Sequence, residues 1–174
     1  MGNARISVPE SGLSFFDHRP ELFAAFNRYY GTLWTDGAVD EATKEVGRLR
    51  NARVTGCNIC KNLRFAGARD GGLTEDLVDE IVDGYADSEL PERYKLVIRY
   101  ADVLITDPKA MTDDLRAALL DEFTPAEIVE LTATITTAMG FSKAAVAFGP
   151  PPEMPVMVVP TPAPGGSVSD PLPT

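Results

Sequence analysis

The residues with the clearest chemical potential are Cys57 and Cys60, the only two cysteines among 174 residues. At this spacing the first turn of a helix can present both thiols on one side, where they can close a local disulfide. A helix N-terminus also favours the thiolate, which is the reactive form of cysteine. The pair therefore predicts a redox-active dithiol or a single activated thiol, with two closely spaced buried cysteines as the structural alternative.

The cysteines could also be half of a metal site, but the chain offers few further ligands. A structural zinc site is usually closed by four Cys or His ligands, and the chain has one histidine, His18. We therefore expect neither a bound metal nor a cofactor. One disulfide across so short a loop would constrain the unfolded chain little, which also argues against a disulfide scaffold.

Basic residues gather around the two thiols, although the chain as a whole is acidic. The formal net charge is −10, yet seven of the 16 basic residues lie between Lys44 and Arg69. Glu45 is the one acid in that window. Nearby positive charge lowers the pKa of a thiol and attracts anionic substrates. The alternative is that several of these side chains are solvated or pair with acids elsewhere in the fold.

Two arginines and the lone acid are the candidates for supporting a thiolate. On a continuous helix Arg64 would lie one turn beyond Cys60, so we expect it to stabilise the thiolate. Arg48, one turn from Glu45, could clamp an anionic substrate or form a plain salt bridge with that acid. A carboxylate facing a thiol in a closed pocket could instead accept its proton.

Helical periodicity dominates the chain and predicts an all-α, compact bundle of about seven helices. Apolar residues recur at three- and four-residue steps, and capping residues precede several of these segments. No segment alternates as a strand would, so we expect no sheet. The expected helices cover about residues 20–35, 41–55, 57–68, 74–82, 91–106, 112–120 and 124–147.

Composition divides the chain into an N-terminal arm (1–19), a helical domain (20–149) and a proline-rich tail (150–174). Nine of the 14 prolines lie in the tail, which cannot be helical. A solvated polyproline-II tail is one interpretation. The apolar residues at 153–160 favour another, in which this stretch packs across a neighbouring surface that could belong to another subunit. From Thr161 onward we expect disorder.

The overall charge and hydropathy indicate where the protein works. No apolar run approaches the roughly 20 residues that span a bilayer. No apolar stretch follows Met1 as it would in a secretory signal. The acidity, with a sequence pI of about 4.5, disfavours nucleic acids and anionic membranes as partners. We expect a cytoplasmic protein whose dithiol is reduced at rest.

The stretch from Glu45 to Cys60, EVGRLRNARVTGCNIC, is similar to the AhpD-like alkylhydroperoxidase branch of the carboxymuconolactone decarboxylase superfamily. His18-Arg19-Pro20, followed by an apolar helix, also resembles the start of that family. The resemblance implies an all-helical fold that assembles as homotrimers or hexamers. It further implies that Cys60 attacks a peroxide, that Cys57 resolves the product as a disulfide, and that Glu45 belongs to a proton relay.

Arg64 departs from this pattern, because the redox branch usually has a relay histidine at that position. Arginine cannot shuttle a proton, although it can stabilise a thiolate or hold a carboxylate. The intact cysteine pair and Glu45 favour a thiol-dependent peroxidase or disulfide oxidoreductase, acting on a small peroxide with a thiol electron-donor protein. The alternatives are a non-redox, decarboxylase-like enzyme for a small carboxylated compound, and a non-catalytic member that has lost the relay.

Overall fold

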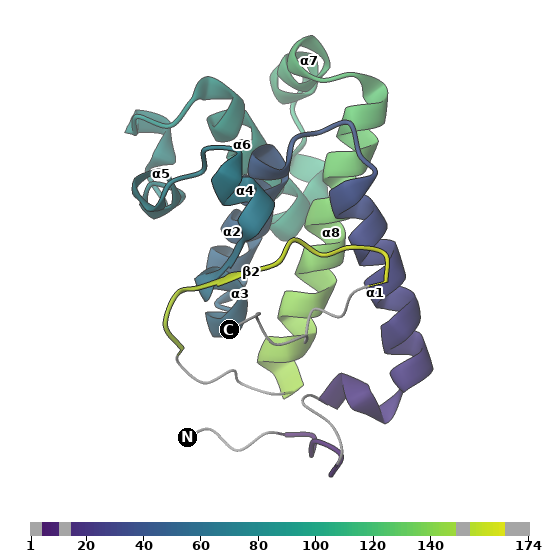
Figure 1. The fold of residues 1–174 in the computed structure, drawn as a ribbon. Helices are drawn as coiled ribbons and strands as arrows, with labels where there is room; N and C mark the ends of the chain where they lie inside the picture. Colours follow the sequence, from purple (N-terminus) through teal and green to yellow (C-terminus); the bar gives the residue numbers. More distant parts are fainter. Residues whose placement is uncertain (1–4, 11–14, 149–153, 166–174) are drawn as a thin grey trace.

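The computed structural model describes residues 5–10, 15–148 and 154–165, and Figure 1 shows its arrangement. The prediction of an all-α fold is confirmed, with eight α-helices and two three-residue strands in the described part. The helices are α1 (Pro20–Thr35), α2 (Glu41–Thr55), α3 (Asn58–Asn62), α4 (Ala66–Asp70), α5 (Glu75–Asp79), α6 (Glu92–Thr106), α7 (Asp113–Glu122) and α8 (Pro125–Phe148). Short 3-10 turns cover Phe15–His18, Tyr85–Asp87 and Pro108–Ala110, and the strands are β1 (Leu63–Phe65) and β2 (Met157–Val159).

Helix α2 is the central element of the fold. Eleven of its 15 residues are buried, because α6, α8 and α4 pack around it. The side chain of Asp40 caps its start by accepting a hydrogen bond from the Thr43 amide at 2.8 Å. Gly56 ends it with a φ of 69°, a left-handed conformation that glycine adopts at no steric cost. This sharp stop places Cys57 directly after the most deeply buried helix.

The main hydrophobic core forms where α2, α6 and α8 meet. Each large aliphatic side chain that is fully buried there contributes about 1.5–3 kcal/mol relative to exposure. The charged residues of α2 must therefore find partners inside this packing, since unpaired buried charges are costly. The aliphatic residues at the centre of the core include Val46, Leu49, Val97, Ile98, Leu131 and Ile135.

The chain after the cysteines differs from the sequence prediction. The single helix expected over 57–68 is wrong, because α3 ends at Asn62 and β1 separates it from α4. The expectation of no sheet is also wrong, since β1 pairs in parallel with β2 from the C-terminal tail. Leu63 lies opposite Met157, and Phe65 lies opposite Val159. Two three-residue strands far apart in sequence leave no periodic signal in either segment.

Residues 154–165 form an extended C-terminal strap that crosses from α3 to α1 (Figure 1). At one end, the Asn62 amide donates to the Met154 carbonyl at 2.6 Å. In the middle, the Thr161 hydroxyl accepts from the Gly67 amide at 2.9 Å and donates to Glu41 at 2.7 Å. The strap thus ties together the segments that flank the cysteine turn.

The predicted packing of residues 153–160 is confirmed for 154–160, and the surface that they cover belongs to the same chain. The expected disorder after Thr161 is wrong for residues 161–165, where Pro162 is buried. Residues 166–174 lie outside the described part. Val159 packs against an aromatic cluster of Tyr30, Trp34 and Phe65, which explains why apolar side chains occur in a proline-rich segment.

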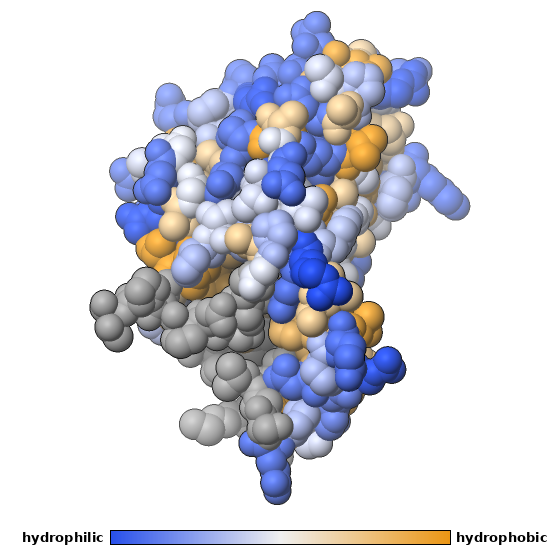
Figure 2. Space-filling model, turned by 45° about the vertical axis from the view of Figure 1, so that its right-hand side comes forward, coloured by the Kyte–Doolittle hydropathy of each residue, from blue (hydrophilic) through white to orange (hydrophobic). Residues whose placement is uncertain are grey.

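The molecular surface is mostly polar on the face shown in Figure 2, with hydrophobic residues in separate patches. Exposed apolar side chains in the described part include Leu22 and Tyr29 on α1 and Val129 on α8. No helix within the described residues is both long enough and apolar enough to cross a membrane.

Gly31 tests the docking of the strap, because a Cβ at this position would overlap the backbone of Ala163 and Pro164. We expect Gly31→Ala to loosen the strap and to speed hydrogen–deuterium exchange in peptides covering residues 154–165. Gly140→Ala is the matched control, since a Cβ there meets nothing within 4 Å. It should leave exchange in the strap unchanged and raise helix stability by up to about 1 kcal/mol. Unaltered exchange in Gly31→Ala would contradict this docking.

Candidate redox site

Cys57 and Cys60 lie at the first turn of α3 and are bonded to each other as a disulfide. Their Cα atoms are 5.3 Å apart, inside the usual range for a bridged pair. Cys57 is the N-cap residue, and its sulfur accepts a hydrogen bond from the Cys60 amide at 3.3 Å. The short helix after Gly56 therefore holds both sulfurs in contact.

The two cysteine residues differ in their exposure to solvent. Cys57 is completely buried, whereas Cys60 is partly exposed. Of the two residues, Cys60 is therefore the one with surface open to solvent. This asymmetry is built by the chain path, since Cys57 follows the buried end of α2 and Cys60 lies one turn further out.

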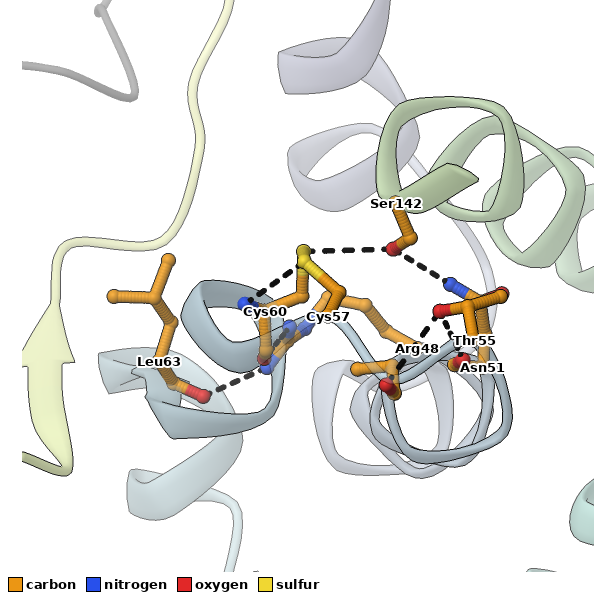
Figure 3. Close-up of a disulfide and its surroundings, with 8 residues drawn as sticks. Arg48, Asn51, Thr55, Cys57, Cys60, Leu63 and Ser142 are labelled. Carbon is orange, nitrogen blue, oxygen red and sulfur yellow. Dashed lines mark hydrogen bonds between the residues drawn. A yellow bond between two sulfur atoms is a disulfide. The ribbon is translucent and has the colours of Figure 1, made fainter. Parts of the chain in front are cut away.

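Ser142 of α8 lies against the disulfide, as Figure 3 shows. Its hydroxyl donates a hydrogen bond to the sulfur of Cys60 at 3.4 Å. Behind it, the Asn51 amide nitrogen on α2 donates to the Ser142 Oγ at 3.0 Å. Both residues are buried, and the sequence analysis did not single out either of them. Only the packing of α8 on α2 brings them to the cysteine turn.

Arg48 and Glu45 form a buried ion pair beneath the cysteine turn. The guanidinium donates to both carboxylate oxygens at 2.6 Å. It also donates to the backbone carbonyls of Cys60 at 2.6 Å and Leu63 at 2.7 Å, and it lies over the ring of Phe65. Arg48 therefore holds the backbone of the turn, and its described hydrogen bonds do not reach a sulfur.

Glu45 stabilises the charged form of Arg48. Burial by itself would lower the pKa of Arg48, but the adjacent carboxylate outweighs burial and raises it. One oxygen of Glu45 also accepts a hydrogen bond from the Phe65 amide at 3.4 Å. The pair thus links α2 to both α3 and β1.

Tyr30 of α1 faces this ion pair, although the sequence placed it only on an apolar helix face. Burial raises the pKa of Tyr30 to about 12, Arg48 opposes that change, and Glu45 adds to it. The phenol therefore stays protonated at neutral pH. Its position beside Glu45 depends on how α1 packs, so no local sequence signal could have found it.

Arg64 does not share a helix with the cysteines, because it belongs to β1. Its guanidinium pairs with Glu75 at 3.1 Å and donates to the carbonyls of Lys61 at 2.7 Å and Leu63 at 3.0 Å. The predicted stripe of Cys57, Cys60 and Arg64 on one helix is wrong for this reason. Arg64 is buried, and its described contacts fix the turn after α3.

Two further basic residues near the site, Lys44 and Arg50, are also paired. Lys44 is buried against Glu130 at 3.0 Å and donates to two carbonyls at the end of α1. Arg50 pairs with Asp102 and Asp83. Four of the seven basic residues from Lys44 to Arg69 are therefore paired with acids: Lys44, Arg48, Arg50 and Arg64.

His18, the one histidine, is exposed and lies within 2.8 Å of the Ser7 carbonyl through its Nε2 atom. Among the described residues, no three His, Cys, Asp or Glu side chains come together as a metal site.

The buried pair predicts an uneven cost for removing similar arginines. Arg48→Met leaves Glu45 buried without its partner, and we expect the free energy of unfolding to fall by about 3–5 kcal/mol. Arg116→Met is the matched control, because Arg116 also pairs with an acid three residues earlier but is 64% exposed. Its loss should cost less than about 1 kcal/mol. Denaturant unfolding measures both, and equal costs would refute the structural role of Arg48.

Tyr30 predicts a pH dependence at high pH. Its pKa is about 12 in the folded chain and 10.0 ordinarily, so the unfolded chain loses this proton first. The free energy of unfolding should therefore fall as pH rises from 10 to 12, by about 2 kcal/mol more in the wild type than in Tyr30→Phe. Unfolding curves at several pH values measure the difference. Parallel pH profiles in the two proteins would contradict the burial of this phenol.

Comparison with known sequences identifies a family. Residues 20–88, which include Glu45 and both cysteines, match the model of the carboxymuconolactone decarboxylase family. Two uncharacterized proteins of Mycobacterium tuberculosis, from strains CDC 1551 and H37Rv, are each 36% identical to the chain over 135 residues. The match covers 77% of this chain and 47% of each relative, so the chain spans about half the length of these proteins.

Comparison with solved structures gives the same fold. An Agrobacterium tumefaciens protein of unknown function, suggested to be the antioxidant defence protein AhpD, matches with a TM-score of 0.67 and 22% identity. That match covers 84% of this chain and 95% of the other. A peroxidase-related protein from Ralstonia eutropha, described as an alkylhydroperoxidase AhpD core, matches with a TM-score of 0.68 and 20% identity over 79% of this chain and 73% of the other. Residues 20–88 therefore match the carboxymuconolactone decarboxylase family, and the chain has the fold of these AhpD-like structures.

Proposed function

We propose that this chain is a thiol-dependent oxidoreductase that reduces small peroxides, with Cys60 as the attacking thiol and Cys57 as the resolving thiol. The observation that carries the proposal is a disulfide between a partly exposed residue, Cys60, and a completely buried one, Cys57. A dithiol used only for packing gains nothing from this asymmetry. The two structural neighbours, one suggested to be an antioxidant defence protein and the other described as peroxidase-related, are consistent with the proposal.

The proposed reaction begins with the reduced dithiol. The Cys60 thiolate attacks the outer oxygen of a hydroperoxide, the O–O bond breaks, and the alcohol leaves after taking up a proton. Two electrons pass from sulfur to oxygen, which leaves Cys60 as a sulfenic acid. The Cys57 thiolate then attacks the Cys60 sulfur, and the sulfenic oxygen departs as water with another proton. The product is the disulfide that the structure contains.

The cycle closes when an external dithiol, such as a redox protein, reduces the disulfide. Its thiolate can attack the exposed Cys60 sulfur and release Cys57 as a thiolate. The Cys60 amide hydrogen bond at 3.3 Å reaches the Cys57 sulfur and would stabilise that charge. A second thiol of the donor then releases Cys60 as a thiolate, and the donor leaves as a disulfide.

Glu45 has a positioning role in this proposal before any role in proton transfer. Both of its oxygens are engaged by Arg48, which in turn holds the Cys60 carbonyl. The Arg48–Glu45 pair and the protonated phenol of Tyr30 beside it form a polar group beneath the cysteine turn. Arg64 stands in this chain where the family usually has the relay histidine. Arg64 fixes the turn after α3, and we assign it no contact with substrate.

A decarboxylase-like reaction on a carboxylated compound is less well supported. That chemistry needs a free cation to hold the substrate carboxylate. Arg48 and Arg64, the two predicted clamps, already pair with Glu45 and Glu75.

A homotrimeric or hexameric assembly, a cytoplasmic location and a protein electron donor stay predictions from the sequence.

Peroxide reduction by cysteine variants tests the proposal. We expect the protein to reduce cumene hydroperoxide with dithiothreitol as the electron source, and Cys60→Ser to fall to the uncatalysed rate. Cys57→Ser, once reduced and freed of dithiothreitol, should complete one turnover and retain a sulfenic acid on Cys60, which a dimedone probe would label. The variant Arg116→Met, changed at an exposed ion pair, is the control and should keep full activity.

Two results would contradict the proposal. One is full peroxide turnover in Cys60→Ser, which would show that the thiol is dispensable. The other is an inactive wild-type protein whose reduced cysteines do not respond to peroxide, which would favour the non-catalytic interpretation.

A further inference from the structure

We propose that Ser142 is a catalytic hydroxyl that supplies a directed hydrogen bond to the Cys60 sulfur, and that Asn51 is the positioning residue that aims it. This proposal rests on the proposed function only in assigning the attack to Cys60. The geometric basis is a chain of two hydrogen bonds, from the Asn51 amide to Ser142 at 3.0 Å and from Ser142 to Cys60 at 3.4 Å (Figure 3).

The direction of the Ser142 hydroxyl follows from the chemistry of the amide group. The amide nitrogen of Asn51 can only donate, so it occupies a lone pair of the Ser142 oxygen. The hydroxyl hydrogen is then free to point at the Cys60 sulfur. Such a donor stabilises a thiolate more than a neutral thiol, because hydrogen bonds to charged acceptors are stronger.

Other hydroxyls of α8 behave differently, which makes Ser142 distinctive. Thr132, Thr134 and Thr136 each donate back to the carbonyl four residues earlier in the same helix. That is the usual local partner of a hydroxyl within a helix. The described bonds of Ser142 instead leave the helix, toward Asn51 and Cys60.

Asn51 has a buried polar atom whose cost in folding free energy a packing role does not explain. Its side chain is fully buried, and its Oδ1 atom has no hydrogen-bond donor among the described residues. A buried polar atom without a partner destabilises a fold, and an apolar residue would avoid this cost. The amide is understandable if its nitrogen is needed to orient the Ser142 hydroxyl.

The consequence for the reaction is that the two sulfurs have different hydrogen-bond donors. Ser142 donates to the Cys60 sulfur, and the Cys60 amide donates to the Cys57 sulfur. Ser142 keeps its own proton throughout, so it supplies electrostatic stabilisation and no proton transfer. The Cys60 sulfur is thereby the one whose negative charge a side-chain hydrogen bond, from Ser142, stabilises.

The test measures thiol reactivity without peroxide, so it can fail or succeed independently of peroxidase activity. In a Cys57→Ser background, Cys60 is the single thiol, and its alkylation by iodoacetamide is followed against pH. We expect Ser142→Ala to move the midpoint of this profile up by about one pH unit, with alkylation below the midpoint slowed about tenfold. Ser142→Thr, which keeps a hydroxyl, should restore the original profile.

Asn51→Leu tests the positioning role through the same readout. If Asn51 acts by aiming Ser142, this variant shifts the profile in the same direction, and the double variant with Ser142→Ala shifts it no further than Ser142→Ala alone. Thr134→Ala is the control, since it removes a buried hydroxyl of α8 that donates to the Glu130 carbonyl. Its profile should match the parent protein.

An unchanged profile in folded Ser142→Ala would overturn the proposal, as would additive shifts from Asn51→Leu and Ser142→Ala. If Asn51→Leu fails to fold, Ser142→Ala and Ser142→Thr still decide the role of the hydroxyl. A peroxidase that remains active while the alkylation profile is unmoved would support the proposed function and refute the role of Ser142.

Discussion

The buried ion pair between Arg48 and Glu45 is the interaction on which the site depends. It lies inside the core, so each charge needs the other to offset the cost of burial. The Arg48 guanidinium also donates hydrogen bonds to the Cys60 and Leu63 carbonyls. Those bonds fix the end of a five-residue helix that could not hold its shape alone in water. The geometry of the dithiol is therefore set by a guanidinium that does not touch sulfur.

The same principle extends along α2, which carries charged residues into the middle of the molecule. Lys44 forms an ion pair with Glu130 on α8, and Arg50 forms one with Asp102 on α6. Each pairing connects α2 to a different neighbour, so the polar residues specify how the helices pack as well as satisfying charge. This arrangement explains how basic residues such as Lys44 and Arg50 can be buried at the centre of the fold.

The C-terminal strap completes the environment of the cysteine turn. Its strand β2 pairs with β1, which directly follows α3, and Val159 covers the aromatic cluster next to Tyr30. The strap thereby covers Phe65, the ring over which the Arg48 guanidinium lies. Ser142 approaches from α8 on another side, and the partly exposed Cys60 is left as the point of access.

The sequence by itself determined the helical class, most helix boundaries and the importance of the cysteine pair, because these depend on local periodicity, capping and spacing. The capping of α2 by Asp40 and its end at Gly56 are examples. Only the tertiary structure decided the partners of Arg64, the β1–β2 pairing, and the placement of Ser142, Asn51 and Tyr30 around the site. Cys60 and Ser142 are 82 residues apart in sequence, and such contacts depend on how whole helices pack. No local pattern records that packing.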